Sequence, residues 1–213
     1  MLLPVPVVGI SQEIILVLDR FMKGVQAKVL VEKSISKATA IYEAYPEFLS
    51  KELRQRVLES EASQFGSQFS IVESQLLKIG EPAVILAPSS MLLGGPSVDY
   101  LKQIAADPCN RLIMLPYQAV ETPGRAIQDG ARQVAIRGET INLQCQVERI
   151  DGFASHSDYN QTMEYVKRLR PKLRRVLVNH GERPKAQNLA SSINKFFKIQ
   201  TQHPLVQEAI KLL

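Results

Sequence analysis

Residues 83–104 have the sequence AVILAPSSMLLGGPSVDYLKQI, and this stretch decides the predicted fold. It begins with Ala83–Ala87, a short apolar run of the kind that a parallel sheet buries on both faces. The turn residues Gly94-Gly95-Pro96-Ser97 then lead into a helix whose apolar stripe is Val98, Leu101 and Ile104. Because a second apolar strand follows at Leu112–Leu115, the stretch predicts two parallel strands joined by a helix.

The alternation of strand and helix extends in both directions. The further predicted strands are Leu2–Val8, Ala27–Val31 and Arg175–Val178. The predicted helices begin near Gln12, Ser34, Ser50, Asp158 and Pro184. Ile141–Glu148 alternates between apolar and polar residues and is predicted to pair antiparallel with Arg132–Arg137. Ser60–Ser74 is polar and patternless, and is predicted to be a loop or a poorly defined helix. The sum is an α/β protein with a mostly parallel sheet flanked by helices.

The composition is that of an ordinary globular protein. The 213 residues suffice for one large domain or two small ones, and 45% of them are hydrophobic and 22% charged. The apolar runs are too short to cross a bilayer, and no basic segment precedes an apolar one at the start, so neither a membrane nor a signal peptide is expected. The two cysteines lack CxxC spacing, which is typical of reduced residues, and a cytoplasmic location is expected.

The net charge of +5 and the pI of about 9.2 suit a polyanionic partner such as nucleic acid. Basic residues cluster between Lys167 and Arg175 and continue at Arg183 and Lys185. On the sequence alone, a solvated helix end followed by a loop explains this cluster at least as well as a binding site does.

Three chemically active side chains fall at junctions beside predicted strands. Glu13 lies where the first strand leads into a helix, His156 lies between a strand and a helix, and His180 directly follows a strand. Because parallel strands place their carboxyl ends at one edge of a sheet, these residues are predicted to converge there. A carboxylate that orients one imidazole, beside a second imidazole free to bind metal, is a usable hydrolytic arrangement.

Each junction also has a purely structural explanation. Asp158 and Gln161 have capping-box spacing, so the turn beside His156 is explained by the start of a helix alone. Glu13 is a first-turn acid that favours the helix dipole, and His180 can simply end its strand. His203 has no partner motif and is predicted to be a surface residue. From spacing alone, the convergent site is the less favoured interpretation.

The same junctions resemble the motifs of a known family, the metallo-β-lactamase/β-CASP nucleases of RNA 3′-end processing. Leu3–Glu13 (LPVPVVGISQE) resembles motif A, Gly152–Asp158 (GFASHSD) resembles motif B and Val178–Glu182 (VNHGE) resembles motif C. The segments similar to the archaeal branch of the cleavage and polyadenylation specificity factor nucleases, in the same order, are Ala38–Glu47, Ile85–Pro96, Tyr117-Gln118-Ala119 and Leu189–Ile193. The resemblance extends from Leu2 to Leu213.

The resemblance implies a fold and a role for each matching residue. It implies a Rossmann-like β-CASP domain over residues 16–149, with residues 1–15 and 150–213 forming part of a metallo-β-lactamase-like αββα domain. Glu13 would hold the ring of His156, and His156 would act as general acid or stabilise the scissile phosphate. His180 would be a zinc ligand. The implied RNA contacts are Ser89, Ser90, Gly94, Gly95, Tyr117, Gln118 and Arg125.

The sequence departs from the family pattern in its metal ligands. The HxHxDH zinc motif does not occur, and one motif histidine cannot hold two zinc ions. The chain alone is therefore expected to bind no zinc and to be inactive. Its expected partners are RNA and an amino-terminal metallo-β-lactamase half or a homologous subunit. Smaller departures occur in segments that the family would use near RNA: Ile10, Pro88 and Glu121.

The carboxyl-terminal tail is expected to form a homodimer contact, as archaeal relatives do, because several of its residues are apolar: Leu205, Val206, Ile210, Leu212 and Leu213. The alternative is that the last two fold back as an edge strand.

Two other functions stay open. A non-catalytic RNA-binding or assembly subunit of a 3′-end processing complex would share the fold without the metal. A small-molecule-binding Rossmann-like domain is disfavoured, because no GxGxxG segment follows a predicted strand.

Overall fold

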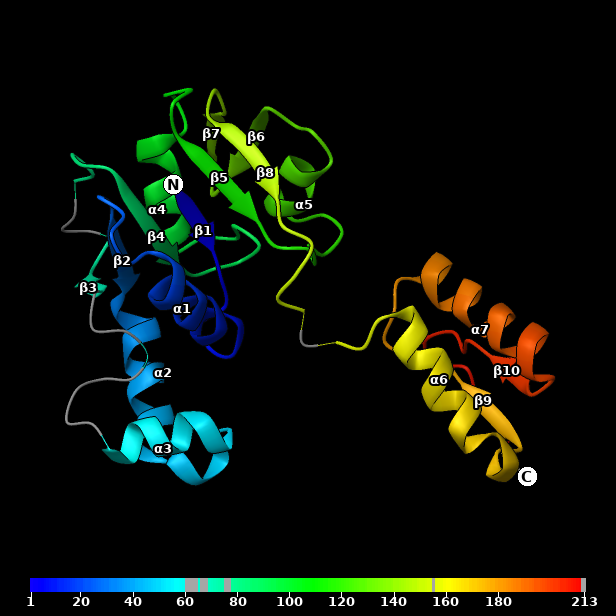
Figure 1. The fold of residues 1–213 in the computed structure, drawn as a ribbon. Helices are drawn as coiled ribbons and strands as arrows, with labels where there is room; N and C mark the ends of the chain where they lie inside the picture. Colours follow the sequence, from blue (N-terminus) through cyan, green and yellow to red (C-terminus); the bar gives the residue numbers. More distant parts are fainter. Residues whose placement is uncertain (60–64, 66–68, 75–77, 155, 212–213) are drawn as a thin grey trace. The chain divides into compact units, whose positions relative to one another are not determined.

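The computed structural model describes residues 1–59, 65, 69–74, 78–154 and 156–211. Two compact units divide the chain, Met1–Ala154 and Ser155–Leu213 (Figure 1). They are called the amino-terminal and carboxyl-terminal units, and each is described by itself. The resemblance implies other domain boundaries, with a β-CASP domain over residues 16–149 and a metallo-β-lactamase-like part over residues 1–15 and 150–213. These boundaries stay a prediction.

The amino-terminal unit alternates strands and helices. Its strands are β1 (Leu2–Pro4), β2 (Lys28–Glu32), β3 (Phe69–Val72), β4 (Ala83–Ala87), β5 (Arg111–Met114), β6 (Gln133–Ile136), β7 (Glu139–Asn142) and β8 (Gln146–Arg149). Its helices are α1 (Ile10–Phe21), α2 (Lys33–Ala44), the 3₁₀ turn η1 (Pro46–Phe48), α3 (Lys51–Glu59), α4 (Pro96–Ile104) and α5 (Pro123–Gln128).

Among the described residues, six parallel strands form the main sheet in the order β3-β2-β4-β1-β5-β8. β1 lies inside this sheet, where Leu2 pairs with Ile85 of β4 on one side and with Leu112 of β5 on the other. The mostly parallel α/β sheet expected from the sequence is therefore confirmed.

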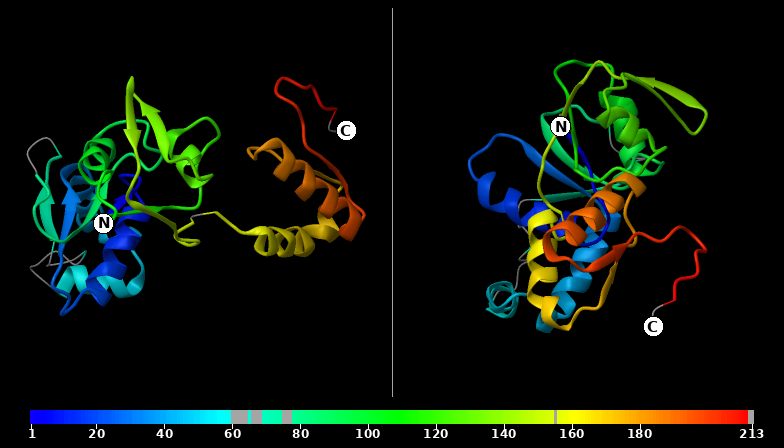
Figure 2. Two further views of the ribbon diagram at one scale, coloured as in Figure 1. Left: turned by 90° about the horizontal axis from the view of Figure 1, so that it is seen from above. Right: turned by 90° about the vertical axis from the view of Figure 1, so that its right-hand side faces the viewer.

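Each face of the sheet supports its own hydrophobic core, because successive residues of a strand point to opposite faces. Leu2 and Ile85 belong to the core that α4, α5 and the β6–β7 hairpin cover. Leu3 and Leu86 belong to the core under α1 and α2, so helices cover both faces (Figure 2). Fully burying one Leu or Ile side chain stabilises the fold by roughly 1.5–3 kcal/mol, which explains why Ala83–Ala87 is apolar throughout.

The hairpin predicted around Gly138-Glu139 is present, but the strand that follows is broken. β6 and β7 pair antiparallel with Gln133 opposite Asn142, and β7 then ends. The N–H groups of both Gln144 and Cys145 donate to the carbonyl of Ala105, at 2.8 and 3.0 Å. These bonds turn the chain out of the hairpin, and β8 joins the main sheet parallel to β5.

Two local details differ from the prediction. The helix predicted to begin near Ser34 starts at Lys33, because the chain enters α2 directly from β2 with Glu32 at the cap position. β3 lies within the stretch predicted to lack a strand, although residues 60–64, 66–68 and 75–77 are outside the described part of the chain.

The carboxyl-terminal unit contains α6 (Tyr159–Leu169), the 3₁₀ turn η2 (Arg170–Lys172), β9 (Arg175–Leu177), α7 (Arg183–Phe197) and β10 (Gln200–Gln202). β9 and β10 pair in parallel, with α7 as the crossover between them. The helices predicted after Asp158 and at Pro184 are confirmed, whereas β10 was not predicted. The starts of α6 and α7 lie at the same end of this unit (Figures 1 and 2).

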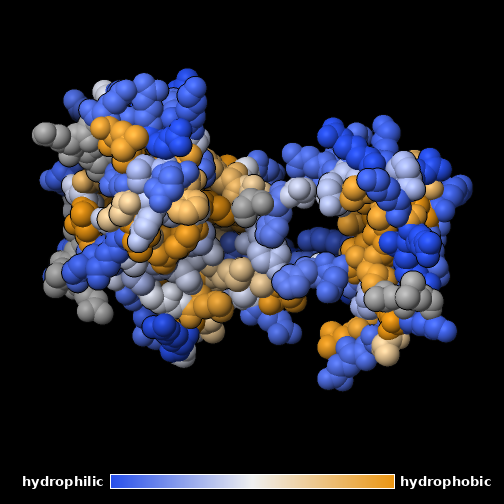
Figure 3. Space-filling model, turned by 90° about the horizontal axis from the view of Figure 1, so that it is seen from below, coloured by the Kyte–Doolittle hydropathy of each residue, from blue (hydrophilic) through white to orange (hydrophobic). Residues whose placement is uncertain are grey.

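Large apolar side chains also reach the surface of both units (Figure 3). Examples are Phe21 and Phe48 in the amino-terminal unit and Phe196 in the carboxyl-terminal unit. None of the described helices is long and apolar enough to span a membrane.

Candidate functional site

The loops that follow the parallel strands carry unusual backbone conformations. Leu92 after β4, Glu121 after β5 and Phe153 after β8 have φ values of 57°, 67° and 55°. In the carboxyl-terminal unit, His180 after β9 has a φ of 68°. A residue other than glycine costs about 1–2 kcal/mol in this left-handed region, and such strain concentrates at functional sites. The carboxyl ends of the strands are therefore the candidate functional regions.

The turn between β1 and α1 holds Glu13 out toward solvent. Ser11 and Gln12 are buried, and the Ser11 hydroxyl donates to the carbonyl of Val7 at 2.9 Å. The Gln12 amide nitrogen donates to Thr39 Oγ1 at 3.0 Å, while its oxygen accepts from the N–H of Gly9 at 2.7 Å. These bonds fix the turn, and Glu13 is the exposed residue that follows.

Residues 88–95 form a loop that hydrogen bonds hold in shape. The carbonyl of Ser89 accepts from Ser97 Oγ at 2.8 Å, and Ser89 Oγ accepts from the N–H of Leu93 at 3.2 Å. Gln118 joins this loop to the next one, since its amide nitrogen donates to the carbonyl of Ser90 at 3.1 Å. Gln118 is 2% exposed, so the structure gives it a positioning role between two loops.

A cavity of about 320 Å³ opens on the same loop, and we call it the Gly94 cavity. It is lined by Ser89, Leu93, Gly94 and the start of α4, together with Arg137 from the β6–β7 turn. The Arg137 guanidinium lies directly against Gly94, where any Cβ would overlap it. Hydroxyl, helix N-terminus and guanidinium are groups that bind phosphate. Arg137 was not predicted from the sequence, because it lies far along the chain from Gly94.

Exposed apolar groups flank these loops. Tyr117, which follows β5, is 62% exposed, and Leu93 and Val120 are also exposed. Tyr117 precedes Gln118, which is bonded to the loop of the Gly94 cavity, and an exposed aromatic ring is a surface on which a nucleic-acid base can stack. Arg125, which the family resemblance implies as an RNA contact, pairs with a carboxylate of the protein: its Nε donates to Asp129 Oδ2 at 2.7 Å.

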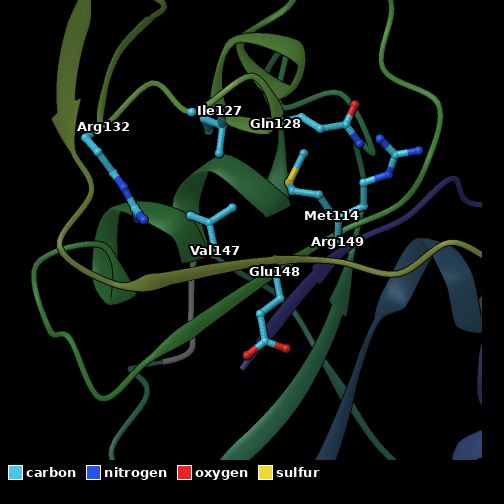
Figure 4. Close-up of a pocket in the computed structure, with 8 residues that line it drawn as sticks. Met114, Ile127, Gln128, Arg132, Val147, Glu148 and Arg149 are labelled. Atoms are coloured by element: carbon cyan, nitrogen blue, oxygen red, sulfur yellow. The ribbon is translucent and has the colours of Figure 1, made fainter.

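A second cavity, of about 190 Å³, lies between α5 and β8 (Figure 4). Its polar groups already have protein partners. Arg132 donates to the carbonyl of Cys145 at 3.0 Å, Arg149 pairs with Asp151 at 2.7 Å, and Gln128 donates to the carbonyl of Leu115 at 3.3 Å. Because these groups are occupied, the Gly94 cavity is the better candidate for binding an anion.

A buried carboxylate lies at the end of β2. Glu32 is 6% exposed and accepts a hydrogen bond from the Tyr100 hydroxyl at 3.3 Å. Burial raises the pKa of Glu32, against the opposing effects of hydrogen bonds from Tyr100 and from the backbone of Ser74. Burial also raises the pKa of Tyr100, and the charge of Glu32 adds to that rise. The pair joins β2 to α4 and has no exposed face from which to act on a ligand.

In the carboxyl-terminal unit, His156 precedes α6 and His180 precedes α7. Both side chains are exposed, and both helices start at the same end of the unit (Figure 1). The capping box is present, since Asp158 accepts from the N–H of Gln161 at 2.7 Å and Gln161 accepts in return at 3.0 Å. Glu13 follows β1 of the main sheet, whereas His180 follows β9 of a separate sheet, so the prediction of one shared sheet edge was wrong. Glu13 belongs to the other unit, and the predicted contact between Glu13 and His156 stays a prediction.

His203 is half-buried and has a local partner. Its Nδ1 lies 2.9 Å from the carbonyl oxygen of Val178. Because a carbonyl oxygen only accepts, Nδ1 is the donor of this hydrogen bond. The bond ties the segment after β10 to the end of β9, two residues before His180.

The described residues do not fit a complete zinc site by themselves. A catalytic zinc ion needs about three protein ligands. Among the residues that the structure describes, no three His, Cys, Asp or Glu side chains gather in a way that would hold a metal ion. His180 therefore stands as one candidate ligand.

Two family models match the chain. One is described as the Beta-Casp domain and matches residues 11–127, and the other is described as the Zn-dependent metallo-hydrolase RNA specificity domain and matches residues 140–204.

Curated relatives named "Transcription termination factor FttA" match 99% of the chain. The relative from Cenarchaeum symbiosum is 47% identical, that from Thermococcus kodakarensis 41% and that from Methanocaldococcus jannaschii 40%. The chain covers 35% of each of these proteins and so spans about a third of the relatives' length.

Proposed function

The chain belongs to the Beta-Casp family, and from this premise we propose that it forms the RNA-contacting part of an RNA-processing nuclease. The zinc centre of that nuclease is completed by residues outside these 213. The observation that carries the proposal is the Gly94 cavity, where Arg137 and the start of α4 line the same space, with the exposed Tyr117 on the loop that Gln118 bonds to Ser90. Phosphate and base would each find a matching partner there.

The proposed mechanism assigns each group a task. Arg137 and the Gly94–Gly95 backbone bind one phosphate, and Tyr117 stacks on a neighbouring base. Gln118 and Ser89 contribute by keeping the two loops in place. Glu13 orients the ring of His156, which holds the proton that the leaving oxygen needs. His180 would be one ligand of a zinc ion, and that ion, when bound, would supply Lewis-acid activation of water.

The names of the relatives suggest the cellular process in which the RNA is bound. We propose that the RNA is a growing transcript and that the complete protein acts in transcription termination. A domain that binds single-stranded RNA without reading base edges suits this task, because a terminating transcript has no single sequence.

Binding of a labelled oligouridine of about 12 nucleotides to the full chain tests the RNA contact. Tyr117→Ala is expected to weaken binding by about tenfold, since one stacked base is lost. Arg137→Gln should weaken it too and lower the salt dependence by roughly 0.7, the value of one phosphate contact on a single strand. Arg54→Gln on α3 is the control with the same charge change. If Arg137→Gln binds like Arg54→Gln, the Gly94 cavity is not the RNA site.

Cleavage separates a nuclease from a non-catalytic subunit. In an assembly that supplies the zinc-binding residues, His156→Ala should abolish cleavage and leave RNA affinity unchanged. Unchanged cleavage would assign the chain to binding or assembly alone.

A further inference from the structure

The positive charge of the chain is concentrated in one unit. Residues 155–213 contain 11 Lys and Arg against 4 Asp and Glu, a net charge of +7. Residues 1–154 contain 15 against 17, a net charge of −2, which together gives the +5 of the whole chain. The Gly94 cavity, the proposed RNA site, therefore lies in the unit that is slightly acidic overall. The residues that line this cavity all belong to the amino-terminal unit.

Within the carboxyl-terminal unit, the basic residues gather at the end opposite to His156 and His180. Those histidines precede α6 and α7. The cluster noted in the sequence lies where α6 ends, in η2 and where β9 begins. The end of α7 and the start of β10 lie at this same end, because α7 is the crossover between two parallel strands (Figures 1 and 2).

Several cations of this cluster are not used inside the protein. Lys167 and Arg168 pair with Glu164 on α6, at 3.5 and 3.1 Å. Arg175 donates to Gln200 Oε1 at 3.0 Å and to the carbonyl of Lys211 at 2.5 Å. At this end of the unit, five exposed cations have no acidic partner among the described residues: Arg170, Lys172 and Arg174 of the cluster, with Lys195 and Lys198 at the end of α7. We call these five residues the basic end.

Helix electrostatics explains only part of the cluster. Basic side chains in the last turn of a helix are stabilised by its dipole, which accounts for Lys167 and Arg168. Lys172 and Arg174 lie beyond that turn and gain nothing from it, because the effect fades within one turn. Holding such cations close together costs repulsion, and a bound polyanion would remove this cost.

An aromatic ring lies among these cations. Phe196, between Lys195 and Lys198 at the end of α7, is 63% exposed. A phenylalanine exposed to this extent buries little apolar surface within the described part of the chain. Basic residues that follow a backbone, with an aromatic ring on which a base can stack, are the combination by which proteins hold single-stranded nucleic acid.

We propose that the basic end is a second RNA-binding surface, with Phe196 as its stacking platform. It holds a stretch of single-stranded RNA away from the end of the unit where His156 and His180 lie. The transcript would thus be gripped at two places, and the basic end would supply salt-sensitive affinity without touching the reacting phosphate. This rests on the proposed function only in taking RNA as the ligand.

The test uses the full chain and the same labelled oligouridine, across a salt series. The variant Arg170→Gln/Lys172→Gln/Arg174→Gln should bind about tenfold or more weakly, with the salt slope lowered by about 2, since three phosphate contacts are lost. The matched control is Lys23→Gln/Lys51→Gln/Arg54→Gln, which makes the same charge change on exposed residues of the other unit. Equal affinity and slope for the two triple variants would overturn the proposal.

Phe196→Leu tests the stacking role while keeping an apolar side chain on an exposed helix position. It should weaken oligouridine binding by about fivefold or more and leave the binding of inorganic polyphosphate unchanged. If Phe196→Leu weakens the binding of both probes equally, or of neither, Phe196 is not a stacking platform for RNA.

The two proposals fail separately. Loss of binding in the basic-end variant, with Arg137→Gln binding like Arg54→Gln, would refute the Gly94 cavity alone. The reverse pattern would refute the basic end alone.

Discussion

Gly124→Ala offers a sharp test of the packing between the loop after β4 and the loop after β5. Gly124 is in the first turn of α5, and its N–H donates to the carbonyl of Met91 at 3.0 Å. An added Cβ would overlap Gln118 Oε1 and lie 3.0 Å from both Gln118 Cδ and the Met91 carbonyl oxygen. Gln118 cannot swing away without losing its bond to Ser90.

The expected sign is opposite to that of a typical helix position. Replacing glycine by alanine in a helix usually stabilises by about 0.5–1 kcal/mol. Overpacking a well-filled interior costs about 1–3 kcal/mol, and displacing Gln118 would add about 1 kcal/mol for its lost hydrogen bond. The free energy of unfolding should therefore fall by about 1–3 kcal/mol.

Urea unfolding followed by circular dichroism measures this change as a shift of the midpoint. Gly80→Ala is the control, because an added Cβ there meets nothing within 4 Å. Combining Gly124→Ala with Gln118→Ala should recover part of the loss, since the overlapping oxygen is gone. A Gly124→Ala protein as stable as the wild type would refute this account of the loops.

Three further predictions concern pH, metal and assembly. Burial raises the pKa of Glu32 above its ordinary 4.5, so the folded state keeps a proton that the unfolded chain releases. The free energy of unfolding should therefore fall as pH rises from about 4.5 through the higher pKa of the folded state. Glu32→Gln should flatten this fall, as measured by urea unfolding at several pH values. Elemental analysis after purification with zinc should find no stoichiometric metal on the isolated chain, and one tightly bound ion per chain would contradict the incomplete ligand set. Leu205 and Val206 are exposed, Val206 by 94%, whereas Leu212 and Leu213 lie outside the described residues. Light scattering should therefore detect a homodimer, and deletion of residues 205–213 should convert it to a monomer. A monomeric wild-type protein would exclude this dimer contact.

The sequence predicted best where burial is complete. Ala83–Ala87 is a strand with the predicted bounds because both of its faces are buried, so every residue had to be apolar. β3 escaped prediction because it lies at the sheet edge, where Ser70 and Ile71 are exposed and no apolar pattern is needed. Apolar and polar residues do alternate in Ile141–Glu148, but the N–H groups of Gln144 and Cys145 bind the carbonyl of Ala105 and interrupt the strand. No local sequence pattern encodes a hydrogen bond to so distant a residue.

The candidate site shows the same limit. Positions such as Tyr117 were found through their resemblance to a motif, and the exposure of this ring supports the proposed contact with RNA. Arg137 was missed because its meaning depends on Gly94, a neighbour in space alone. Gln118 has a motif position but a buried side chain, and a motif cannot distinguish a residue that touches a ligand from one that holds a loop.

The interior place of β1 has a consequence for synthesis on the ribosome. Its neighbours in the sheet begin only at Ala83 and Arg111, so β1 emerges long before either partner exists. At about 5–20 residues per second, the wait for β4 alone lasts roughly 4–16 seconds. During that time Leu2, Leu3 and Val5 have no sheet to enter, and they are open to chaperones or to wrong partners. β1 is thus among the first parts of this unit to be made, yet both of its sheet neighbours are made much later.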